Sequence, residues 1–296
     1  MIRHWLRHLL QASPHPSTAA DSAAPPPAAP GALTPTGPGD TYVLPRTRQE
    51  QDRLDLQHFA LRQFLGSHFL APVRDPRAIL DVGTGSGIWL REAARCWPQA
   101  RLIALDKDLS LLRTPLPPHC QPVQADLLSG LPFPDASFDY IHQRLLVAAI
   151  PLTAWPGVLS DLLRVTAPGG WLEFVEATGQ VFHEGPHQAR VRAWFETLAA
   201  RRGLHLTAPL QIPDWLRSLG LHPTVRAYET PLFGKAYGAP LFRRDLLASL
   251  QSVAPILASV NQVPLSLVEE TLSALPAEWE RQRTCCGLLT VWGCKP

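Results

Sequence analysis

The chain has 296 residues, which suits one large domain or one domain with additions. Hydrophobic residues make up 46% of it and the formal net charge is only +2 at pH 7, a charge too small to indicate nucleic acid as a partner. No apolar run approaches the length of about 18 residues that a membrane span needs, so stable membrane insertion is not expected. The five cysteines are an odd number without paired ligand spacing, which argues against a disulfide framework or a zinc site. Free thiols in a reducing compartment are the simplest interpretation, and they favour a cytoplasmic protein.

The first 40 residues are predicted to form an arm outside the folded domain. Residues 2–10 have the spacing of a short basic amphipathic helix, but a helix of this length is unstable alone. Residues 11–40 are rich in Pro, Ala, Ser and Gly and cannot bury enough apolar surface to offset the entropy of ordering, so we expect disorder there. The folded domain is therefore predicted to span residues 41–296.

An amphipathic helix is predicted over residues 48–70. Thr47 begins a capping box, a typical N-terminal signal of a helix. Leu54, Leu61 and Leu65 fall on one face of this helix. A helix with such a face must cover apolar surface, and we expect it near a ligand cleft.

A glycine-rich turn follows the first predicted strand, Ile79 to Val82. Gly83, Gly85 and Gly87 stand between that strand and a helix over residues 88–97. Glycines at this place let backbone N–H groups approach a ligand closely, as in sites for dinucleotides and for S-adenosylmethionine. The dinucleotide fingerprint requires a further glycine where this chain has Ile88, which argues against a nicotinamide oxidoreductase.

Two more predicted strands end in acidic residues. Residues 101–106 end in Asp106, which lies 19 residues after Gly87, the place of an acid that accepts hydrogen bonds from ribose hydroxyls. Residues 121–125 precede Asp126 and contain Pro122, and a proline is tolerated mainly in an edge strand. An N-cap role for Asp106 and a solvated loop acid at Asp126 are the alternatives.

The rest of the chain continues the alternation of strands and helices. Strands are predicted at 138–143, 171–176, 221–230 and 288–294. Helices are predicted at 156–167, 187–202, 213–219, 240–259 and 264–283. Such alternation indicates an α/β fold with a doubly wound, mainly parallel sheet.

These motifs together resemble one branch of the class I S-adenosylmethionine-dependent methyltransferases, the branch that includes LaeA and the UMTA-type enzymes. The resemblance covers residues 41–178 and rests on segments whose order in the chain is distinctive. They are Tyr-Val-Leu-Pro at 42–45, Gln-Asp-Arg-Leu-Asp-Leu-Gln-His at 51–58, the glycine turn, Phe-Asp-Tyr-Ile-His at 138–142 and Pro-Gly-Gly-Trp-Leu-Glu at 168–173.

The resemblance implies a Rossmann-like seven-stranded sheet of order 3-2-1-4-5-7-6, with helical cap insertions at about 183–220 and 240–283 over the cleft. It also implies S-adenosylmethionine as the cofactor, with Asp106 on the ribose, Asp126 and the Leu127 backbone on the adenine, and Tyr42 in a lid. The full set of residues expected at the cofactor is Tyr42, Asp81, Gly83, Thr84, Gly85, Gly87, Asp106, Lys107, Asp126 and Leu127.

The expected function is methyl transfer to a small molecule, in the setting of natural-product pathways. The signature of amino-group methylation on nucleic-acid bases is absent after the fourth strand, where residues 141–144 read Ile-His-Gln-Arg. His142 is the first candidate for a general base and Glu176 the second, with a hydrogen bond to a loop amide as the alternative for Glu176. No metal ligands are predicted. The competing hypothesis is a regulatory protein that binds S-adenosylmethionine and acts through partners.

Overall fold

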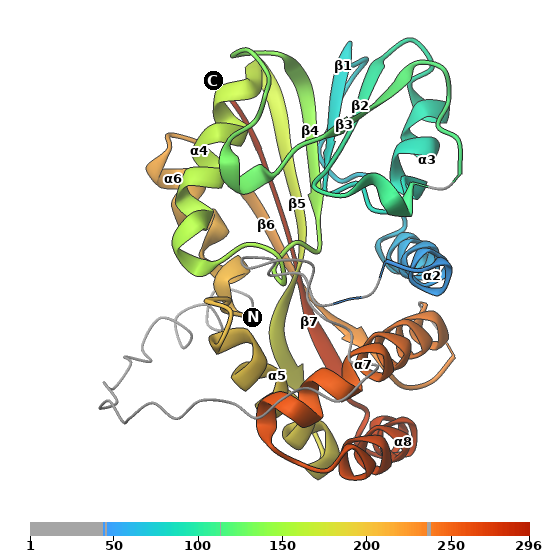
Figure 1. Cartoon of the computed structure of the whole chain (residues 1–296). Coiled ribbons are helices and arrows are strands. Elements are labelled where there is room, and N and C mark those ends of the chain that lie inside the picture. The colour runs from blue at the N-terminus through green and yellow to red at the C-terminus, as the bar shows by residue number, and fades with distance from the viewer. Residues whose placement is uncertain (1–43, 45, 113, 236–237) are drawn as a thin grey trace, which may run out of the picture. The chain divides into compact units, whose positions relative to one another are not determined.

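Seven strands form one mixed sheet in the order β3-β2-β1-β4-β5-β7-β6, which confirms the predicted α/β fold and its strand order (Figure 1). The computed structural model describes residues 44, 46–112, 114–235 and 238–296. The pairs β1–β2, β1–β4, β2–β3 and β4–β5 are parallel, whereas β7 is antiparallel to both β5 and β6. The strands are β1 (Ala78–Val82), β2 (Arg101–Asp106), β3 (Cys120–Gln124), β4 (Phe138–Arg144), β5 (Thr166–Phe182), β6 (Thr224–Pro231) and β7 (Cys285–Cys294).

The predicted N-terminal arm, its short helix at 2–10 and Tyr42 lie outside the described residues. In the described part of the chain, the α-helices lie within two residues of their predicted ends, with one exception. They are α2 (Arg48–Leu65), α3 (Ile88–Cys96), α4 (Trp155–Val165), α5 (Pro186–Ala200), α6 (Ile212–Ser218), α7 (Ala239–Asn261) and α8 (Leu265–Gln282). None of these helices combines the length and the apolar character needed to cross a membrane.

The exception is α2, which was predicted to reach residue 70 but ends at Leu65. Its N-terminus is as predicted, because the Thr47 hydroxyl accepts a hydrogen bond from the N–H of Glu50 at 3.3 Å. Its C-terminus is set by Gly66, which has a left-handed backbone (φ 73°) and donates its N–H to the carbonyl of Arg62. A glycine in this conformation is a common helix stop, so the apolar residues beyond it belong to a loop.

The burial of the strands follows the position of each strand in the sheet. All five residues of β1, in the middle of the sheet, are buried, as expected for a parallel strand covered on both faces. At the edge of the sheet, Pro122 in β3 is exposed and pairs beside Ala104 of β2. The proline therefore occupies the edge strand predicted for it.

Strand β5 extends well beyond its predicted end at residue 176. It continues to Phe182, with a register shift against β7 between Ala177 and Val181. The extension was not predicted because Thr178, Gly179 and Gln180 lack the apolar pattern of a buried strand. Figure 1 shows that α5, α7 and α8 gather around the extended ends of β5 and β7.

Three apolar clusters fill the described fold. Leu80 and Leu159 belong to the cluster between the sheet and α4 and α6, and Ile79 and Leu90 to the cluster between the sheet and α3. A third cluster packs α2, α5, α7 and α8 around the extension of β5 and β7. Of the helices in the predicted cap, α5, α7 and α8 thus share a core beside the carboxyl ends of the parallel strands, whereas α6 packs with α4 against the sheet.

Candidate functional site

A cavity of about 340 Å³ lies at the carboxyl ends of β1, β2 and β4. The strand order reverses between β1 and β4, and in open α/β sheets this switch point is where ligands bind. Six of the residues predicted at the cofactor line the cavity, namely Gly83, Gly85, Asp106, Lys107, Asp126 and Leu127. Leu54 and Gln57 of α2 also line it, as expected for a helix next to the cleft.

The glycine turn has the backbone that only glycine adopts easily. Gly83, Gly85 and Gly87 have φ angles of 69°, 54° and 73°. A Cβ atom at Gly83 would lie 2.6 Å from Cδ2 of Leu146, and one at Gly85 would lie 3.2 Å from Leu54. The turn therefore brings its backbone closer to the cavity wall than a residue with a side chain could.

Asp81 and Thr84 hold the turn from behind and do not line the cavity. The Thr84 hydroxyl donates a hydrogen bond to Oδ2 of Asp81 at 2.7 Å, and both side chains are buried. Gly87 lies beside them as the N-cap of α3. These three residues shape the turn, so direct contact with a ligand is not supported for them.

Asp106 joins the end of β2 to the turn. Its Oδ2 accepts a hydrogen bond from the N–H of Gly85 at 2.9 Å, and its Oδ1 accepts one from the N–H of Asp108 at 3.1 Å. Burial raises the pKa of this carboxyl above its ordinary value. A partly buried carboxylate that lines a cavity and retains lone pairs can accept further hydrogen bonds from a ligand.

Asp126 and Lys107 form the rim of the cavity beyond β3. Lys107 Nζ lies 3.0 Å from Oδ2 of Asp126, whose Oδ1 accepts the N–H of Leu128 at 3.0 Å. Asp126 is therefore the N-cap of the short 3₁₀ helix Leu127–Ser129 as well as a lining residue.

His142 occupies a place that does not support the predicted base role. Its side chain is buried, its Nδ1 lies 3.0 Å from Oδ1 of Asp81, and its ring stacks parallel on Trp89 with centroids 3.8 Å apart. His142 and Asp81 are register partners on neighbouring strands, so both side chains point to the α3 face of the sheet. His142 does not line the cavity at the glycine turn.

Glu176 is a loop anchor, the alternative weighed from the sequence. Its carboxylate is fully buried and accepts hydrogen bonds from the N–H groups of Leu146 at 3.0 Å and Val147 at 3.1 Å and from the side-chain amide of Gln143 at 3.2 Å. Burial raises the pKa of Glu176 to about 7. Residues 145–150, which line the cavity, are held in place by this carboxylate, and Glu176 itself does not line it.

The sequence model of a family described as a methyltransferase domain matches residues 49–224, a segment that contains the whole of this cavity's strand framework. The chain belongs to this family. Its members of the class I type, the type that the motifs resemble, use S-adenosylmethionine as the methyl donor.

Named methyltransferases are among the relatives of this protein. It is 40% identical to methyltransferase str3 of Strobilurus tenacellus over 133 residues, which cover 44% of this chain and 47% of that protein. It is 34% identical to the secondary metabolism regulator laeA of Gibberella zeae, over 46% of this chain and 44% of that protein. N-methyltransferase sirN of Leptosphaeria maculans is 26% identical over 88% of this chain and 96% of that protein. The chain spans about half the length of the first two of these relatives.

The chain carries a polar network on α2 that was not predicted from the sequence. The Arg53 guanidinium donates to both carboxylate oxygens of Glu50 and to Oδ1 of Asp245 in α7, and Gln57 donates to Oδ2 of Asp245 at 3.1 Å. Arg53, Glu50 and Asp245 are all buried. The spacing of Glu50, Arg53 and Gln57 along one helix face was visible in the sequence, but their partner on α7 was not.

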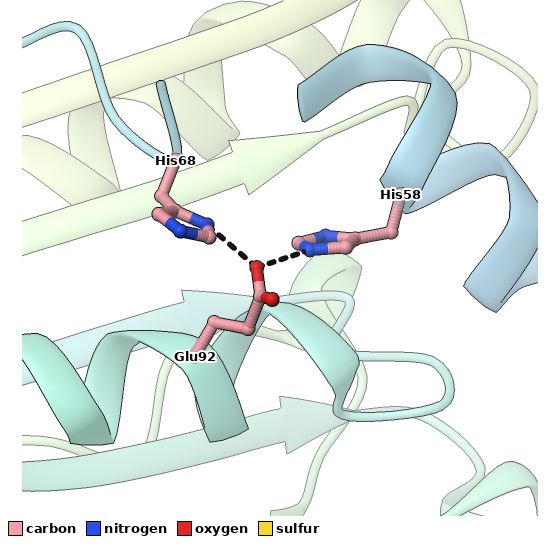
Figure 2. Close-up of side chains that lie close together, drawn as sticks. All are labelled: His58, His68 and Glu92. Atoms are coloured by element: carbon pink, nitrogen blue, oxygen red, sulfur yellow. Dashed lines mark hydrogen bonds and ion pairs between the residues drawn. The ribbon is translucent and has the colours of Figure 1, made fainter. Parts of the chain in front are cut away.

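A second unpredicted cluster joins α2 to α3 (Figure 2). His58 Nε2 and His68 Nδ1 both lie 2.6 Å from Oε2 of Glu92, and Arg62 donates to Oε1 of Glu92 at 2.8 Å. The His58 contact is a hydrogen bond, whereas the His68 contact is short but poorly aligned for one. Two imidazoles and a carboxylate are a donor set that several transition metals accept, and the sequence analysis predicted no metal ligands.

The surroundings of this cluster favour hydrogen bonding over metal binding. Arg144 Nη1 lies 3.2 Å from Nδ1 of His58, and an arginine can only donate, so Nε2 of a neutral His58 must carry the proton. Burial, and next the charge of Arg144, lower the pKa of His58 to about 4, which keeps the ring neutral at pH 7. A metal at this place would have to displace that proton and sit close to the charges of Arg62 and Arg144.

Proposed function

We propose that this protein transfers a methyl group from S-adenosylmethionine to a small organic acceptor. The observation that carries the proposal is that the cavity at the glycine turn adjoins a second, mainly apolar cavity of about 260 Å³. The two cavities share Gln57, Leu145 and Ala177 as lining residues. A methyltransferase needs adjoining sites of this kind, because donor and acceptor must meet in line.

The residues at the first cavity fit the cofactor. The positive φ angles at Gly83 and Gly85 expose backbone N–H groups, as a closely approaching ligand requires. We assign the ribose hydroxyls to Asp106, and the adenine to Asp126 and the Leu127 backbone. Lys107 keeps Asp126 in place through their ion pair.

Arg144 is our candidate for the carboxylate of the cofactor's methionine part. It lines the cavity at the end of β4, where its Nη1 lies 3.2 Å from Nδ1 of the neutral His58 ring. Among the described residues no carboxylate forms a direct ion pair with Arg144. Its guanidinium therefore keeps a charge that a ligand carboxylate can use, in a fork geometry suited to that group.

The bound cofactor supplies a methyl group that is already activated on a sulfonium. The chain's own residues then have mainly to position the reactants and to exclude water. Apolar residues that line the first cavity, among them Leu145 and Leu146, would help to exclude water. Since His142 and Glu176 do not line this cavity, no base role is proposed for either.

The relatives support the expected setting. The relative sirN is named as an N-methyltransferase, and laeA as a regulator of secondary metabolism. We therefore place the acceptor among natural-product intermediates. The sequence similarity to laeA also favours a second candidate function, that of a regulatory protein that binds S-adenosylmethionine and acts through partners. Methyl transfer to any small molecule separates the two, because a regulator of that kind holds the cofactor without turnover.

The experiment that tests the cofactor site is calorimetric titration with S-adenosylhomocysteine of the wild type and of Asp106→Asn. We expect the variant to keep its fold and to lose affinity. Equal affinity of the two proteins for S-adenosylhomocysteine would show that Asp106 does not bind the cofactor, and the proposed orientation of the cofactor would then be wrong.

A further inference from the structure

The second cavity lies among the extended ends of β5 and β7 and the helices α2, α5 and α7. Most of its wall is apolar, as illustrated by Leu61, Val191, Phe195, Leu232, Phe242 and Leu288. Its size suits a small organic molecule or part of a larger one. An apolar ligand would gain roughly 25 cal/mol for each Å² that it buries there.

Only two of the described residues in this wall are charged, Arg192 and Asp245. The guanidinium of Arg192 is already paired with acidic side chains. Its Nε and Nη2 donate to the carboxylate of Glu184 at 3.0 and 2.9 Å, and its Nη1 donates to Glu196 at 2.8 Å. Two carboxylates therefore neutralise this guanidinium, and an anionic ligand would find no available positive charge on it.

Asp245 lies where the second cavity meets the cofactor cavity. It accepts hydrogen bonds from Arg53, which lines the cofactor cavity, and from Gln57, which lines both. A carboxylate offers about four lone-pair sites, so two accepted bonds leave room for another donor. The guanidinium of Arg53 also donates to both oxygens of the buried Glu50 carboxylate, so it is shared between two acids.

We propose that the second cavity binds an apolar acceptor, uncharged or cationic, which donates an N–H or O–H group to Asp245. This inference rests on the proposed function, and it specifies the class of molecule that would accept the methyl group. The hydrogen bond to Asp245 would hold the donor-bearing atom of the acceptor at the wall shared with the cofactor cavity. Carboxylates and phosphates are excluded as methyl acceptors, because they would be buried against Asp245 without a free cation.

Binding of three probes with one skeleton tests the inference. Phenylbutylamine, phenylbutanol and phenylbutyrate differ at one end as a cationic donor, a neutral donor and an anion. We expect the amine and the alcohol to bind the S-adenosylhomocysteine-saturated protein about tenfold or more tightly than the anion, as one hydrogen bond to a charged group predicts. The preference should disappear in Asp245→Asn. Equal binding of the three probes, binding of none, or an unchanged preference in Asp245→Asn would overturn the inference.

A pair of variants on α7 tests the location. Leu246 lines the second cavity only, and Leu246→Trp should fill it and weaken amine binding at least about tenfold. Arg244, two residues away, is exposed, so Arg244→Trp places the same side chain outside the cavity and should bind the amine as the wild type does. Equal amine affinity of both variants would contradict the location.

Titration with S-adenosylhomocysteine separates the two levels of the proposal. Normal cofactor affinity in Leu246→Trp and Asp245→Asn shows that these variants fold. If the protein binds the cofactor but shows no preference among the probes, the proposed acceptor class is wrong and the proposed function still stands. If the wild type does not bind the cofactor, the proposed function is wrong. Titration of the free protein with the three probes then tests only whether the second cavity binds an apolar donor. If Asp245→Asn does not fold, the inference is still tested by the probe preference of the wild type and by the two variants Leu246→Trp and Arg244→Trp.

Discussion

The carboxylate of Asp106 accepts a hydrogen bond from the backbone N–H of Gly85 at 2.9 Å, and so it ties the end of β2 to the glycine turn after β1. The side chain expected on the ribose thus also shapes the turn that approaches the cofactor. Strand ends and turn form one unit, and a change in either should affect ligand affinity.

Replacing Asp106 by Ala should weaken binding of S-adenosylhomocysteine by about 1.5–3 kcal/mol, the range for hydrogen bonds to a charged group. Calorimetric titration measures this difference. Asp135→Ala is the matched control, because Asp135 is an exposed acid that pairs with Arg164 and does not line the cavity. Similar losses of affinity in both variants would point to a general effect of charge.

Alanine substitutions at two glycines should separate backbone strain from ligand contact. Gly83 and Gly203 have nearly equal φ angles, 69° and 66°, but a Cβ at Gly83 meets Leu146 whereas one at Gly203 meets nothing within 4 Å. Both variants should lose roughly 1–2 kcal/mol of folding free energy because of the left-handed backbone. Only Gly83→Ala should also lose affinity for S-adenosylhomocysteine. Normal affinity of a folded Gly83→Ala would contradict the role of the turn.

Glu176 should make the stability of the protein depend on pH in a defined direction. Its folded pKa, about 7, lies above its ordinary value of 4.5, so between these values the folded state binds more protons than the unfolded state. This contribution to stability is therefore present at pH 4.5 and is lost as the pH rises through 7. The melting temperature of Glu176→Gln, compared with the wild type at pH 5 and pH 8, should lack this component. Parallel pH profiles of the two proteins would show that Glu176 does not titrate in this range.

The same variant tests the anchor role. A glutamine at position 176 must turn its NH₂ group towards one of the donors that now bind the carboxylate, so a buried N–H or amide loses its partner. We expect a loss of about 1–3 kcal/mol in the free energy of unfolding. Denaturant titration at pH 8 measures it, and no loss would remove Glu176 as the anchor of residues 145–150.

Removal of divalent metals should leave the stability unchanged. In the cluster of His58, His68 and Glu92, the proton on His58 and the charges of Arg62 and Arg144 oppose a cation. Dialysis against a chelator and addition of equimolar Zn²⁺ should both leave the melting temperature where it was. A rise with Zn²⁺ that disappears in His68→Ala would establish a metal site at the cluster.

The sequence predicted the places of the strands and the glycine turn, because these are local features, but not the full length of β5, which spans Thr166–Phe182. The apolar run Ile79–Val82, the three glycines and the acid at Asp106 each carry their own short-range signal. Their order along the chain, together with the resemblance, was enough for the sheet order.

The roles of His142 and Glu176 were harder to predict, because a strand end points its residues alternately to two faces. His142 shares its face with Asp81 and α3, which only the register of β1 and β4 determines. Glu176 is turned towards the loop after β4. The Arg53–Asp245 pair joins residues 192 positions apart, so no local pattern could have indicated it.

The central claim is the identity of the cofactor, and calorimetric titration of the full chain with S-adenosylhomocysteine, with NAD in parallel, tests it most directly. We expect micromolar binding of S-adenosylhomocysteine, about −8 kcal/mol, and no binding of NAD. Binding of NAD in its place, or of neither compound, would contradict S-adenosylmethionine as the cofactor of this protein.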